Sequence, residues 1–274
     1  HDSSVGYETR VEAAVRSFRL HLRRLPAAGP EPIPWPEASQ IARPVSRERQ
    51  EHWDRLDPRA TRSLEGKTLV FPNWDPVTCP LLVANLRHEG INAILIEETT
   101  VTLKRSLRMN NGQCLPLNLI AQGFVDCVRA RQLDPARTLL WMDQSEVCSL
   151  KLFPHHIRTL LSRYGEGMER ATVYLGNLSF HEISLKAAIS SYFAYLCGGR
   201  LRQLVCRTRP YETVPGAADR ALAQGVARMT EAFAGKEDRE AILSEVVDLF
   251  AQIPVKREPR PRVAVFGDIY VRDN

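Results

Sequence analysis

Six cysteines are the side chains of this 274-residue chain whose type and spacing are best suited to chemistry. They are Cys79, Cys114, Cys127, Cys148, Cys197 and Cys206. No two of them form a CxxC pair, so the paired ligand spacing of a zinc ribbon or zinc finger is absent. A small disulfide scaffold does not fit a chain of this length without a signal segment. The thiols are therefore either inert core side chains or ligands that the fold brings together.

Strands and helices alternate along the middle of the chain, and these elements must position the cysteines. Short, continuously apolar runs predict strands at residues 67–71, 91–96, 138–142 and 171–175. Helical periodicity predicts helices at residues 77–88, 116–131 and 154–164, and residues 99–109 are expected to form a helix or an irregular segment. Continuously apolar strands separated by helices indicate a parallel sheet that is covered on both faces. We therefore predict an α/β fold with a doubly wound parallel sheet.

The sequence divides into three predicted parts. Residues 1–65 contain an amphipathic helix and a proline-rich arm, and residues 66–180 form the α/β domain. Residues 181–274 form a helical section, which ends with the first strand of a further α/β unit. The helices of this section are expected at residues 184–196, 199–206, 217–233 and 237–253, and the strand at residues 263–266. Because the chain stops just after this strand, we expect it to be a fragment of a longer protein.

Charge and composition exclude several classes of protein. The net charge is +5, but only six of the 37 basic residues are lysine and the arginines are scattered, so we expect no nucleic-acid partner. There is no apolar run of membrane-spanning length and no signal segment, which predicts a cytoplasmic protein. The phosphate-binding GxxxxGK[ST] motif, the GxGxxG motif and the GxSxG elbow are all absent.

Three cysteines fall in the predicted connections, where ligands of doubly wound sheets bind. Cys79 follows the first strand, Cys114 precedes the helix at residues 116–131, and Cys148 follows the third strand. Three thiolates suit an iron–sulfur cluster with one open iron, and zinc less well. The alternative for Cys79 is a place on the apolar face of its helix.

The other three cysteines are expected to pack in the core. Cys127 lies in the middle of a predicted helix on an apolar stripe, whereas Cys197 and Cys206 end apolar helical stretches.

Four segments resemble motifs of one known family. Residues 112–119 (GQCLPLNL) resemble a G-x-E-C-L-P-x-x-L motif, and Cys148 falls where the family has G-P-C-R after a strand. Residues 209–219 resemble R-P-Y-E-x-x-x-G-x-x-D, and residues 263–274 are similar to G-x-V-G-E-x-Y-V-R-x-N. The family is a conserved domain of large acyl-CoA dehydratase activase-related proteins, also called CoA-substrate-specific enzyme activases. The resemblance covers residues 66–274 in order, although Gln113 and residues 146–149 (EVCS) depart from the motifs.

The resemblance implies an electron-transfer module for anaerobic metabolism, because the family is related to 2-hydroxyacyl-CoA dehydratase and benzoyl-CoA reductase systems. It implies a [4Fe–4S] cluster at Cys114 and Cys148, with ATP bound by an actin-like-fold ATPase domain outside this segment. By position the third ligand is Cys79, with Cys206 as the competitor. Arg207 and Arg209 are candidates to contact the phosphates of a CoA-linked substrate or partner. The alternative is a cluster-free domain that docks CoA, the ATPase domain or a dehydratase partner.

Overall fold

The described strands and helices agree closely with the sequence-based predictions. The computed structural model describes residues 64–109, 114–143, 152–261, 267 and 270. The described elements run in the order β1 (Thr68–Phe71), α4 (Cys79–His88), β2 (Ala93–Leu95), α5 (Thr100–Leu107), α6 (Leu115–Ala130), β3 (Thr138–Asp143), α7 (Phe153–Tyr164), β4 (Thr172–Gly176), α8 (Leu185–Thr208), α9 (Ala217–Phe233) and α10 (Arg239–Ala251). With the exception of α8, each begins and ends within two residues of its predicted range.

The four strands form one parallel sheet, which confirms the predicted α/β fold. Their order is β2-β1-β3-β4. Val70 of β1 pairs with Ile94 of β2 on one side and with Leu140 of β3 on the other. All three side chains are buried, because helices cover both faces of the sheet.

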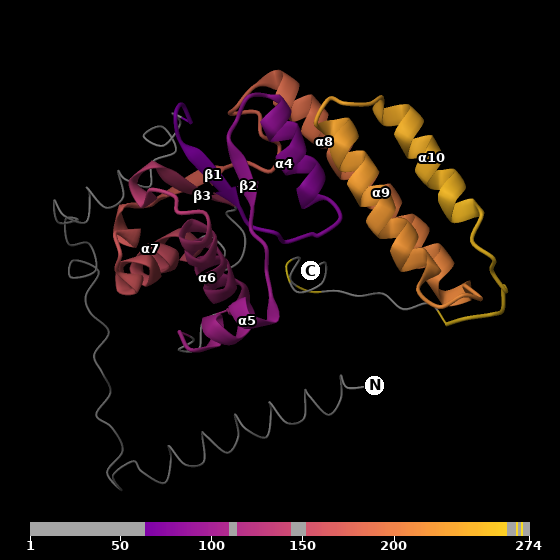
Figure 1. Cartoon of the computed structure of the whole chain (residues 1–274), viewed down its shortest axis with the longest axis horizontal. Helices are drawn as coiled ribbons and strands as arrows, with labels where there is room; N and C mark the ends of the chain where they lie inside the picture. Colours follow the sequence, from indigo (N-terminus) through magenta and orange to yellow (C-terminus); the bar gives the residue numbers. More distant parts are fainter. Residues whose placement is uncertain (1–63, 110–113, 144–151, 262–266, 268–269, 271–274) are drawn as a thin grey trace, which may run out of the picture. The chain divides into compact units, whose positions relative to one another are not determined.

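Helices lie on both faces because the chain crosses the sheet in two directions. It moves from β1 to its neighbour β2, and then back over β1 to β3 and on to β4. With right-handed connections, this path places α4 on one face and α6 and α7 on the other. The packing agrees, since α4 contacts α8 and α9 whereas α6 contacts α5 and α7. Figure 1 shows these two groups of helices on opposite sides of the strands.

Four aromatic side chains pack together near the carboxyl ends of β1 and β3. The ring of Phe71 lies 4.9, 4.6 and 5.8 Å from the rings of Trp74, Trp141 and Phe180, measured between centroids. Gly176 at the end of β4 makes room for this cluster, because a Cβ built there would lie 2.0 Å from Nε1 of Trp141. The cluster fixes the segments that leave the sheet after β1 and β4.

Helix α8 differs from the prediction, which placed two helices at residues 184–196 and 199–206. It is one continuous helix, Leu185–Thr208, that runs through Gly198 and Gly199. Two adjacent glycines disfavour a helix locally, but tertiary packing requires one of them. A Cβ on Gly198 would lie 2.1 Å from Oγ1 of Thr78, so only glycine lets α8 approach the start of α4 this closely.

The helical section and the sheet share one hydrophobic core. The amide nitrogen of Asn85 on α4 donates to Oγ of Ser191 on α8 at 3.0 Å, and Leu201 of α8 is fully buried. The strand expected at residues 263–266 and most of the proline-rich arm lie outside the described residues. Within the described part of the chain, no helix is both long and apolar enough to cross a membrane.

Candidate functional site

The carboxyl edge of the sheet is the place where a doubly wound fold binds its ligands. The strand order reverses between β1 and β3, so the connections after these strands leave in opposite directions. This is the switch point at which doubly wound folds form their ligand crevice. Asp75 follows β1, and Asp143 is the last residue of β3. The residues that continue from β3, numbers 144–151, lie outside the described residues and include Cys148.

Asp75 organises the connection between β1 and α4. It does not cap α4, because this helix begins at Cys79 with Thr78 in the cap position. Oδ1 of Asp75 instead accepts a hydrogen bond from the backbone N–H of Val77 at 2.9 Å. The same oxygen accepts a hydrogen bond from the guanidinium of Arg202 on α8. This partly buried ion pair ties α8 to the edge of the sheet.

Cys79 is fully buried at the first turn of α4. Burial raises the pKa of its thiol far above the usual value, and the negative charges of Asp75 and Glu98 raise it further. Backbone hydrogen bonds near Asp75 and Trp74 act in the opposite direction but are outweighed. The side chain also packs in the hydrophobic core together with Leu82 of the same helix. This environment fits the core alternative for Cys79 better than the ligand alternative.

Tyr195 joins the same edge from α8. Its hydroxyl donates to the backbone oxygen of Leu178, which follows β4, at 3.1 Å. Burial raises the pKa of Tyr195, and so do the neighbouring Cys79, Asp143 and Asp75. The edge therefore gathers a protonated phenol and two carboxylates around a buried thiol.

Sequence reasoning missed both Tyr195 and Arg202. The two positions are seven residues apart, which is about two helical turns, so they share one face of a continuous helix. Because the sequence predicts two separate helices that meet at Gly198 and Gly199, it does not indicate that Tyr195 and Arg202 share a face. Had α8 been predicted as one helix, the spacing of 195, 198 and 202 would have indicated a common face that carries polar groups.

Cys114 is in a different environment from Cys79. It is exposed and directly precedes α6, a helix of 16 residues, in the cap position. The unpaired N–H groups and the dipole of a helix N-terminus stabilise a thiolate. The sequence-based prediction that Cys114 lies just ahead of a helix is confirmed.

The start of α6 lies beside two other segments. Leu115 and Pro116, which follow Cys114, line a hollow of about 320 Å³ together with Glu98 after β2 and with Tyr270. Tyr270 belongs to the C-terminal motif of the family resemblance, and Leu115 and Pro116 belong to the first motif. Two motifs that are about 150 residues apart thus meet at one edge of the sheet.

The remaining cysteines divide by exposure. Cys127 is partly buried and packs against the core, and Cys197 is buried, as the sequence predicts. Cys206 is exposed on the last turn of α8, so its predicted place in the core is wrong. Cys206 lies about one helical turn beyond Arg202, the residue of α8 that pairs with Asp75, and no described residue covers it.

The segment that follows Cys206 folds into a corner. Arg209 forms an ion pair with Asp219, while Arg207 is exposed. The carboxylate of Glu212 accepts hydrogen bonds from the backbone N–H groups of Gly216 at 2.6 Å and Ala218 at 2.7 Å. The charged residues of this third motif therefore stabilise the start of α9.

The described residues do not by themselves complete a metal centre. Within residues 64–109, 114–143 and 152–261, with 267 and 270, no three His, Cys, Asp or Glu side chains are grouped to hold a metal ion. Cys148, the second predicted ligand, is not among these residues. No family model, no curated protein and no solved structure matches the chain.

Proposed function

We propose that this chain is an iron–sulfur electron-transfer module of an ATP-dependent reductase or activase that resembles the acyl-CoA dehydratase activases. The observation that carries the proposal is the position of Cys114, an exposed thiol at the N-terminus of α6. Cys114 is followed directly by Leu115 and Pro116, which line a hollow together with Tyr270 of the C-terminal motif. A cluster transfers single electrons, and thiolates at helix N-termini are suitable ligands for its iron.

The proposed ligands are Cys114 and Cys148. Cys148 belongs to the connection that follows β3, and the β3 strand adjoins β1 at the crevice. We leave Cys79 out of the ligand set because its side chain is fully buried in the hydrophobic core. Cys206 is exposed and becomes the candidate for the third ligand.

The residues around the crevice hold its shape. The Asp75–Arg202 ion pair and the hydrogen bond from Tyr195 to Leu178 fasten α8 to the ends of β1 and β4. In the proposed system ATP is bound by a separate actin-like-fold domain, and the module works in the cytoplasm. Arg207 is the exposed arginine that remains available for a CoA phosphate, since Arg209 is paired with Asp219.

The test is anaerobic purification, or reconstitution with iron and sulfide, of the full chain. Under the proposal the protein is brown and absorbs broadly near roughly 400 nm. Cys114→Ala and Cys148→Ala should lose this absorbance. Cys127→Ala is the matched control, because Cys127 packs against the core and should leave the absorbance unchanged.

A cluster-free binding domain is the second candidate. Two observations favour it: Cys79 is fully buried in the core, and α8 presents a large apolar face that fits a protein partner. A colourless protein without iron after reconstitution would support this candidate and exclude the first.

A further inference from the structure

An ordinary surface helix buries its large apolar side chains, whereas α8 buries small side chains and exposes large apolar ones. Its buried residues are mostly small, and they are Ala187, Ser190, Ser191, Ala194, Cys197, Gly198, Leu201 and Val205. Its outer face carries the large apolar side chains Leu185, Ile189, Tyr192, Phe193 and Leu196, which are between 49% and 75% exposed. Isolated exposed apolar residues are normal, but a contiguous row of five on one helix marks an interaction surface.

The spacing of this row specifies the kind of partner. Leu185, Ile189, Tyr192 and Leu196 are separated by four, three and four residues, which is the a/d pattern of a helical seam. A seam of this kind accepts another helix that packs along it. It extends over about 17 Å, at 1.5 Å for each residue.

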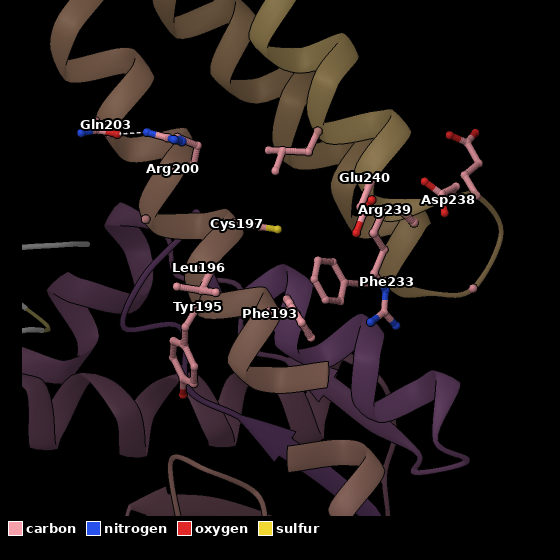
Figure 2. Close-up of a pocket in the computed structure, with 15 residues that line it drawn as sticks. Phe193, Tyr195, Leu196, Cys197, Arg200, Gln203, Phe233, Asp238, Arg239 and Glu240 are labelled. Carbon is pink, nitrogen blue, oxygen red and sulfur yellow. Dashed lines mark hydrogen bonds between the residues drawn. The ribbon is translucent and has the colours of Figure 1, made fainter. Parts of the chain in front are cut away.

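A groove continues the seam toward α9 and α10. It has a volume of about 1030 Å³, and Phe193, Leu196, Phe233 and Leu243 are among its lining residues. Figure 2 shows Phe193 of α8 beside Phe233 of α9. A helix that lies along the seam would therefore also cover apolar surface on the α9 side.

We infer that the outer face of α8 binds α8 of a second copy of this chain, with the two helices antiparallel about a two-fold axis. The 4-3-4 spacing reads the same in both directions, so antiparallel pairing sets Leu185 against Leu196 of the other copy and Ile189 against Tyr192. All four layers of the seam are then filled by the same surface on both copies, which is the arrangement of an isologous dimer.

The charges along the seam agree with self-association. Lys186 is the only charged residue between Leu185 and Leu196, and it already forms an ion pair with Glu89 of the same chain at 3.1 Å. The groove beside the seam is lined by charged residues of both signs, so two identical surfaces can approach without a like-charge conflict; they are Arg200, Glu237, Asp238, Arg239 and Glu240.

The exposed area is sufficient for a dimer. Tyr192 and Phe193 have areas of about 150–250 Å² each and the three aliphatic side chains are smaller, so the exposed fractions leave at most on the order of 600 Å² of apolar surface on each copy. If all of it is covered, two copies bury about 1,200 Å², the lower limit of specific interfaces. This inference is independent of the proposed cluster, because Cys114 lies on the other side of the sheet edge, at the start of α6.

Sedimentation velocity of the full chain at micromolar concentrations tests the inference. The wild-type protein should be a dimer, and Ile189→Glu and Tyr192→Lys should each be monomeric. Val101→Glu is the matched control, because Val101 is similarly exposed on α5 and its substitution should leave the dimer intact. Circular dichroism should show unchanged helix content in all three variants.

Mixing the two monomeric variants tests the antiparallel register. In a dimer with one copy of each variant, the introduced glutamate of Ile189→Glu faces the introduced lysine of Tyr192→Lys. The other central layer keeps its native Ile189 and Tyr192 side chains, so association should return. A mixture that stays monomeric would overturn this register. A monomeric wild-type protein would overturn the inference. The partner of the outer face of α8 would then be residues 1–63 or another protein.

Discussion

The two adjacent glycines of α8 offer the sharpest test of how this helix is held on the sheet domain. Alanine at either position favours the helix by up to about 1 kcal/mol, because glycine loses more backbone entropy when it folds. A Cβ at Gly199 meets open space, so Gly199→Ala should show this stabilisation alone.

A Cβ at Gly198 has no such space. It would lie 2.1 Å from Oγ1, 3.0 Å from Cβ and 3.3 Å from Cα of Thr78. Rotation of the threonine side chain can relieve only the first of these contacts, so α8 must shift away from α4. Overpacking of this kind costs about 1–3 kcal/mol. Gly198→Ala should therefore be less stable than Gly199→Ala by about that amount.

Urea denaturation followed by far-ultraviolet circular dichroism measures this difference. The two variants have the same composition and the same change in helix propensity, so the difference in their free energies of unfolding reports the contact with Thr78. In a thermal scan it corresponds to about 2–4 °C in Tm for each kcal/mol. Equal stability of the two variants would refute the close packing of α8 on α4.

Three further predictions concern the edge of the sheet. Gly176→Ala should lower the free energy of unfolding by about 1–3 kcal/mol, since its Cβ would overlap the indole of Trp141; an unchanged urea midpoint would contradict the aromatic packing. Asp75→Ala and Arg202→Ala should each destabilise by about 1.5–3 kcal/mol and be strongly non-additive in a double-mutant cycle, whereas simple additivity would show that the pair does not form. The pKa of the Cys79 thiol is raised from its usual 9.0. Its contribution to the free energy of unfolding is therefore complete below about pH 9 and is lost as the pH rises further. The free energy of unfolding that Cys79→Ala loses relative to the wild type, measured by urea denaturation, should therefore shrink by about 1.4 kcal/mol per pH unit above about pH 9. A loss that stays constant with pH would mean that the thiol ionises in the folded protein.

Local sequence patterns were sufficient to predict the strands and most helices. The strands are buried on both faces, so they are continuously apolar, and the helices that cover them carry apolar stripes with a period of 3.6 residues. The same local reasoning failed at Gly198 and Gly199. A glycine pair has low intrinsic helix propensity, and only the contact with Thr78, 120 residues earlier in the chain, explains why the helix continues.

The site was less accessible to sequence reasoning than the fold. Cys114 could be placed ahead of a helix because its neighbour Pro116 is typical of a first helical turn. The pairing of Asp75 with Arg202 could not be predicted, because it joins residues 127 positions apart and depends on where α8 packs. Cys79 shows both sides of the problem: its helix was predicted, but the extent of its burial depends on the tertiary packing of α8 over α4.

The iron content of the reconstituted protein is the measurement that tests the central claim most directly. With a [4Fe–4S] cluster held by Cys114, Cys148 and a third ligand, the wild-type chain should bind about four iron atoms and as many sulfide ions. Cys114→Ala should bind almost none, while Cys79→Ala should keep the wild-type amount because its thiol is buried in the core, outside the proposed ligand set. A wild-type chain that binds no iron, or a Cys114→Ala variant that binds as much as the wild type, would contradict the proposed electron-transfer function.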